Sequence, residues 1–111
     1  MTKRAYLGDL EEIVLLAVAR CEPDAYGMRI RQEIEAQTER QVAIGAVYAS
    51  LERLEDKGYI KPARPPADGE RDPRARKFFA VTPAGASAAQ ETAALRDRLW
   101  RGLTLRRKEG R

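Results

Sequence analysis

The chain has 111 residues, 43% of them hydrophobic, and this length can bury one modest core. No stretch approaches the ~20 apolar residues of a membrane span, and the segment MTKRAYLGDLEE turns acidic where a signal peptide would turn apolar, so we expect a cytoplasmic protein without membrane contact. Histidine is absent and cysteine occurs once, which excludes a zinc site and the usual Cys/His or Ser/His/Asp nucleophiles. We expect no enzyme, no metal and no cofactor.

The net charge of +4 is distributed unevenly along the chain. Acidic side chains predominate over residues 9–40, and basic ones predominate over 61–77 and 96–111. Localised positive charge suits a polyanion such as DNA, although a basic tail is also typical of a solvated chain end. The neighbouring carboxylates at 11–12, 33–35 and 55–56 fall at surface-like helical positions, and we interpret them as solvated faces rather than catalytic pairs.

The first predicted helix is apolar nearly all round. Such a helix needs cover on two sides, and a domain this small covers one of them well, so we expect a partner chain on the other. Its apolar residues are Leu10, Ile13, Val14, Leu15, Leu16, Ala17 and Val18. Cys21 at its end is interpreted as a half-buried small hydrophobe without a chemical role.

A second helix is predicted after Pro23, with Asp24 as its cap and Tyr26, Ile30 and Ile34 as its apolar stripe. Gly27 lies in its first turn. Because glycine is otherwise a costly choice in a helix, its presence indicates that another backbone approaches closely, in a tight helix crossing.

The stretch IGAVYASLERLEDKGYI, residues 44–60, predicts a third helix that ends at Gly58 and passes into a strand. Val47, Leu51 and Leu54 mark the core face. The opposite face has small residues and one long base, which suits a helix that lies in a DNA major groove. Its residues are Ala46, Ala49, Ser50 and Arg53.

A hairpin is predicted next, with the Asp68-Gly69 turn signal at its tip and the alternating strand KFFAVT as its second arm. Thr82 and Pro83 then supply a hydroxyl cap and a proline at the first position of a last helix. Phe79 and Val81 are expected to face inward. The fold class is therefore mainly α with a β-hairpin wing, namely a winged helix-turn-helix domain over residues 1–82, followed by a dimerisation helix and basic tail over 83–111.

Three blocks of sequence resemble the PadR family of transcriptional regulators. The blocks are YGMRI, VYASLERLEDKGYI and RKFFAVTPAG, and they stand in the family's order within roughly residues 7–90. The resemblance implies a homodimeric repressor of the small PadR class, which has a single C-terminal helix and often responds to phenolic acids, drugs or other small hydrophobic effectors. Ala43, Ala46 and Ala49 depart from the family pattern, where hydroxyl residues and a proline are frequent.

The resemblance also implies DNA contacts. Tyr48 matches the recognition-helix tyrosine, whose hydroxyl can reach a phosphate, although a tyrosine here can also belong to the core. Gly45 matches a glycine that lets the backbone approach a phosphate. On the expected DNA face we place Gly45, Ala46, Tyr48, Ala49 and Arg53, and in the wing Arg71, Arg74, Arg76 and Lys77.

The last helix carries a stripe of Ala88, Thr92, Leu95, Leu99 and Leu103, and we expect this helix to run about 35 Å from Pro83 into the basic tail. The stripe exceeds what so small a domain can cover, so we expect it to pack on a partner subunit. The predicted dimer interface comprises Leu7, Leu10, Val14, Val18, Leu95, Leu99 and Leu103. Trp100 either lines an effector pocket between subunits, as the resemblance implies, or only anchors the dimer.

These observations predict a sequence-specific repressor that binds an inverted-repeat operator on double-stranded DNA as a homodimer and is released by a small hydrophobic effector. The alternative is a winged helix that binds another protein and has no operator.

Overall fold

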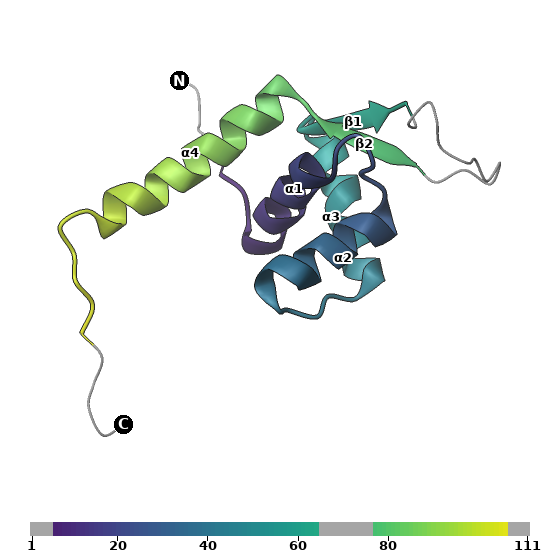
Figure 1. Cartoon of the computed structure of the whole chain (residues 1–111). Helices are drawn as coiled ribbons and strands as arrows, with labels where there is room; N and C mark the ends of the chain where they lie inside the picture. The colour runs from purple at the N-terminus through teal and green to yellow at the C-terminus, as the bar shows by residue number, and fades with distance from the viewer. Residues whose placement is uncertain (1–5, 65–76, 107–111) are drawn as a thin grey trace.

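The computed structural model describes residues 6–64 and 77–106. Within them the chain forms helices α1 (Asp9–Cys21), α2 (Gly27–Thr38) and α3 (Ile44–Asp56), strands β1 (Ile60–Ala63) and β2 (Phe78–Val81), and helix α4 (Pro83–Trp100). The first three helices form a compact body from which the hairpin and α4 extend on opposite sides (Figure 1). None of the described helices is both long and apolar enough to cross a lipid bilayer. This order confirms the predicted fold class.

Helix α1 lies at the centre of the domain and packs against α2, α3, β2 and α4. This explains why it is apolar nearly all round. Val14 and Val18 are 0% exposed and Leu15 is almost as deeply buried, so the domain itself covers these faces. The prediction that Val14 and Val18 meet a partner subunit is therefore wrong, because no part of either side chain reaches the surface. Leu16 is the large apolar residue of α1 that stays largely exposed.

Helix α2 begins later than predicted. Asp24 makes no cap, and the helix begins at Gly27 behind Tyr26, whose backbone is extended. Tyr26 forms a single antiparallel bridge with Phe78, and their rings meet edge to face with centroids 5.4 Å apart. The segment before α2 is thus tied to the hairpin, and α2 begins without a side-chain cap.

The core face of α3 matches the prediction, since Val47, Leu51 and Leu54 are buried. Ser50 is also fully buried, which corrects its placement on the outer face. The chain leaves the helix through Gly58, whose φ of +79° is the left-handed conformation that glycine adopts most readily. β1 then pairs antiparallel with β2, with Ile60 opposite Val81.

Helix α4 begins as predicted, with the Thr82 hydroxyl accepting a hydrogen bond from the Gly85 amide and Pro83 in the first turn. Its first half lies on the domain, where Ala88 and Thr92 are buried and the Thr92 hydroxyl accepts from the Leu7 amide at 3.1 Å. The helix ends at Trp100, which gives about 27 Å for its 18 residues instead of the expected 35 Å.

The close contact between the start of α4 and the chain before β1 gives a test. A methyl group on Gly85 would collide with the backbone carbonyl of Tyr59, which has no flexible side chain to yield. We expect Gly85→Ala to lower the free energy of unfolding by about 3 kcal/mol, as overpacked core positions do. Urea denaturation followed by circular dichroism measures this. Gly45→Ala is the control, because Gly45 lies within helix α3 (Ile44–Asp56) and nothing lies within 4 Å of its added methyl group; equal stability of the two variants would contradict the packing described.

Candidate nucleic-acid interface

The turn between α2 and α3 sets the angle at which α3 leaves the body. The Arg31 guanidinium donates to the Val42 carbonyl at 2.9 Å and also pairs with Glu35 one turn further along α2. Val42 is itself buried. This side chain therefore holds the start of α3 against α2.

The exposed side of α3 carries small residues near its N-terminus. Gly45 and Ala49 are exposed, while Ala46 is half-buried against the core. The N-terminal residue Ala43 supplies no side-chain cap, as its identity predicts. Small side chains let a second body approach the helix backbone closely, as a major groove would.

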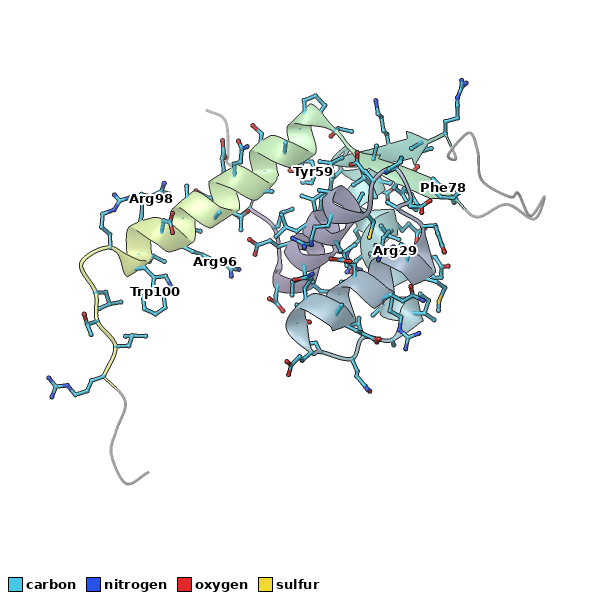
Figure 2. All side chains as sticks on the ribbon, in the orientation of Figure 1. Arg29, Tyr59, Phe78, Arg96, Arg98 and Trp100 are labelled. Carbon is cyan, nitrogen blue, oxygen red and sulfur yellow. The ribbon has the colours of Figure 1, made fainter. Side chains whose placement is uncertain are left out.

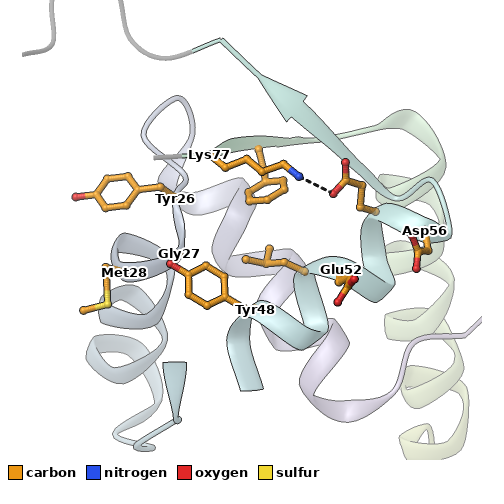
Figure 3. Close-up of a pocket in the computed structure, with 10 residues that line it drawn as sticks. Tyr26, Gly27, Met28, Tyr48, Glu52, Asp56 and Lys77 are labelled. Carbon is orange, nitrogen blue, oxygen red and sulfur yellow. Dashed lines mark hydrogen bonds and ion pairs between the residues drawn. The ribbon is translucent and has the colours of Figure 1, made fainter. Parts of the chain in front are cut away.

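Tyr48 lies on this exposed side with 52% of its surface accessible. Its phenol ring packs over Gly27 on α2, where an added methyl group would lie 2.5 Å from the ring carbon Cε1 (Figure 3). Another part of the chain does come close at Gly27, but the predicted helix crossing is wrong, because the partner is the Tyr48 side chain rather than a helix backbone. Gly27 therefore sets the position of the tyrosine.

Arg53 turns back toward the body. Its Nε donates to Glu11 of α1 at 3.0 Å, and Lys57 reaches the same carboxylate at 3.0 Å. Glu11 is only 7% exposed, so the sequence-based interpretation of this carboxylate as part of a solvated face is wrong. A charge this deeply buried needs partners, and α3 provides two. Sequence periodicity cannot reveal this contact, because the pair is separated by 42 residues.

The environment of Glu11 has opposing effects on its acidity. Burial raises the pKa of this carboxyl, but the hydrogen bonds from Lys57 and Arg53 lower it, and the net result lies below the ordinary value. Glu11 is therefore ionised at neutral pH and joins α1 to the C-terminal half of α3.

At the base of the hairpin, Lys77 pairs with Glu55 of α3 at 3.3 Å and its ammonium lies 5.5 Å from the centre of the Phe79 ring. Lys61 and Arg64 are exposed and have no ion pair within the described part of the chain. The predicted wing residues Arg71, Arg74 and Arg76 lie outside the described residues.

The far end of α4 projects away from the body and carries Trp100 (Figure 2). Leu99 is 70% exposed and Trp100 is 56% exposed, while Leu95 is half-buried. Leu103 lies beyond the helix, after the left-handed Gly102, and is also exposed. Of the predicted interface residues on the body, Leu10 is half-buried and Leu7 is buried. Leu95, Leu99 and Leu103 are thus available to a partner, as Leu10 is in part.

This arrangement of three helices, a hairpin and a projecting helix defines a winged-helix protein of the kind that regulates transcription. Residues 15–91 match the PadR-like family of transcriptional regulators, and the chain belongs to this family. It is a DNA-binding transcription regulator and not an enzyme. No curated protein is significantly similar in sequence.

Solved structures share the fold. A PadR-like transcription factor from Bacteroides fragilis is 26% identical, with a TM-score of 0.63 over 81% of this chain and 82% of that one. A PadR-like regulator from Bacillus cereus is 20% identical, with a TM-score of 0.61 over 85% and 93% of the two chains. MarR from Escherichia coli in its apo form is 21% identical, with a TM-score of 0.61 over 88% and 67%.

The buried carboxylate provides a pH-dependent test. Because the pKa of Glu11 is lowered in the folded chain, its stabilisation is present above the unfolded value near 4.5 and is lost as pH falls through the folded value. We expect Glu11→Gln to lower the free energy of unfolding by about 1–3 kcal/mol at pH 7, and the difference from the wild type to shrink below pH 4.5. Urea titrations across this pH range measure it. Glu35→Gln, which removes an exposed pair within α2, is the control with an expected effect under about 0.5 kcal/mol; a pH-independent difference for Glu11→Gln would contradict this account.

Proposed function

We propose that the protein is a homodimeric repressor that binds an operator with inverted half-sites about one helical turn, roughly 34 Å, apart. The observation that carries this proposal is the exposed N-terminal half of α3, with its small residues and one tyrosine that packs over Gly27. The small side chains around Ala49 leave room for the wall of a DNA major groove, and Tyr48 offers a hydroxyl to a phosphate.

Phosphate contacts come mainly from outside α3 in this proposal. Arg53 and Lys57 are already paired with Glu11, so Arg53 reaches a phosphate only by leaving that carboxylate. The exposed bases Lys61 and Arg64 and the predicted wing bases supply the remaining positive charge. The wing thus contributes most of the salt-dependent affinity.

The exposed apolar end of α4 supports the dimer. Burial of a side chain such as Leu99 contributes about 1.5–3 kcal/mol of stabilising free energy, and the body of the same chain does not cover it. A second copy related by a two-fold axis would cover Leu95, Leu99 and Leu103 and would place two α3 helices on one side of a duplex. Residues 83–111 then act as the dimerisation segment.

Trp100 is the proposed effector contact. It lies on the uncovered end of α4, where an indole ring can stack on a flat hydrophobic molecule held between subunits. The same position suits an indole that only anchors the dimer. A molecule bound there would release the operator by changing the distance between the two α3 helices.

The alternative function is a protein-binding winged helix. One observation favours it, namely that the large apolar side chain of Leu16 on α1 is 48% exposed on the surface of the body. Phosphate binding weakens steeply as salt concentration rises, whereas an apolar protein interface does not. Salt dependence therefore separates the two functions.

DNA binding is tested on the segment upstream of the protein's own gene. We expect saturable binding in fluorescence anisotropy that weakens steeply with salt. Tyr48→Phe removes one hydrogen bond, worth about 1 kcal/mol, and should weaken binding about fivefold. Gly27→Ala should weaken it at least as much without loss of stability, because the added methyl group displaces the movable Tyr48 ring. Arg53→Ala should also weaken binding. Wild-type affinity in all three variants would show that another face binds DNA, and the absence of any salt-sensitive site would favour the protein-binding module.

The role of Trp100 is tested by one measurement on a variant and one on the wild type. Sedimentation equilibrium gives the dimer constant of Trp100→Ala, and indole fluorescence of the wild type reports titration with planar hydrophobic compounds. A variant that stays dimeric, together with wild-type emission that a compound quenches, supports an effector contact. Unperturbed emission and a monomeric variant would show that Trp100 only holds the dimer together.

A further inference from the structure

A groove of about 600 Å³ opens between the start of α2, the outer side of α3 and the base of the hairpin (Figure 3). Its aromatic walls come from three different elements. They are Tyr26 at the start of α2, Tyr48 on α3 and Phe79 on β2. Contacts elsewhere in the fold hold these rings in place, since Tyr26 packs edge to face on Phe78 and Tyr48 lies over Gly27. Phe79 is buried.

The charged side chains of the groove are mainly acidic. Glu52, Glu55 and Asp56 on α3 face one base, Lys77. Glu55 is paired with that lysine, whereas Glu52 and Asp56 are exposed and have no ion pair among the described residues. The part of the groove next to Glu52 and Asp56 therefore attracts a cation.

One cation already occupies part of this groove, and it belongs to the chain. The Lys77 ammonium lies 3.3 Å from the Glu55 carboxylate and 5.5 Å from the centre of the Phe79 ring. An ammonium between a carboxylate and an aromatic face is the arrangement by which proteins bind organic cations. The Lys77 side chain is 60% exposed, so it can swing into solvent and vacate the position.

We propose that this groove binds a flat, hydrophobic organic cation. Its ring would lie against Tyr26 and Tyr48, and its positive charge would lie near Glu52 and Asp56. The class is distinct from that of anionic phenols, which the carboxylates disfavour, and the position is distinct from the Trp100 end of α4. A bound cation would contact Tyr48 and Lys77 and so compete with DNA; this consequence, unlike the binding itself, rests on the proposed function.

Isothermal titration calorimetry of the full chain with 2-naphthylmethyl-trimethylammonium tests the site without DNA. The matched anion 2-naphthylacetate has the same ring and the opposite charge. We expect one saturable site per chain for the cation and no binding of the anion. Glu52→Gln combined with Asp56→Asn should weaken cation binding about tenfold or more, whereas Lys77→Ala should tighten it because the internal competitor is gone.

Two controls separate this groove from other sites. Asp97→Asn removes an exposed carboxylate on α4 outside the groove, and Trp100→Ala removes the proposed effector contact; neither should change cation binding. Equal binding of cation and anion, an unaffected double variant, or loss of binding in Trp100→Ala would overturn the proposal.

In a fluorescence anisotropy experiment, we expect the cation to displace a DNA duplex from the wild type but not from the double variant. A cation that binds and leaves a saturable DNA complex intact would refute the competition, while a failure of DNA binding alone would refute only the proposed function.

Discussion

The burial of α1 is the constraint on which the rest of this small domain depends. The helix has α2, α3, α4 and β2 around it, so its side chains supply the contacts that hold these elements together. Val14 and Val18 have no exposed surface at all. A chain of 111 residues cannot build two cores, and placing its most apolar helix at the centre buries the largest apolar area per residue. The hairpin and α4 then occupy the remaining sides.

Glu11 extends this dependence from packing to charge. It is a buried carboxylate on α1 whose partners, Arg53 and Lys57, both come from the C-terminal half of α3. The contact fixes α3 on the body and at the same time removes two positive charges from its outer side. What remains exposed there is small residues at one end and the carboxylates of the groove at the other, with Tyr48 between them. The two ends of one helix thus have different chemistry, which suits a DNA contact near Gly45 and a cation near Glu52.

Helix α4 is divided in a similar way. Its first half is fixed on the domain by Gly85 and Thr92, which meet Tyr59 and the amide of Leu7. Its second half ends in exposed apolar side chains at Leu99 and Trp100. A single helix that is rigidly attached at one end and uncovered at the other can transmit a change at a subunit interface to the body that carries α3. The proposed dimer and effector contact use this geometry.

The sequence by itself determined the elements and most of the core. The i, i+4, i+7 pattern of Val47, Leu51 and Leu54 identified the buried face of α3, and Gly58 and Thr82 marked the points where helices end and begin, because these signals are local. The close approach at Gly27 was also predictable from the cost of glycine in a helix, although its partner was not.

Only the tertiary structure decided which faces are covered and how the charges pair. The sequence of an apolar helix surface is the same whether a partner subunit or the rest of the chain covers it. The pattern therefore predicts Val14 and Val18 at an interface, although they belong to the core. Likewise, an acidic side chain in a helix is predicted to be solvated unless the position of its partner on another helix is known. Glu11 meets Arg53 across 42 residues of sequence, and Tyr26, Tyr48 and Phe79 meet in one groove from three elements. Such contacts depend on how the helices cross, and helix crossing is set by the packing of all side chains together rather than by any local pattern.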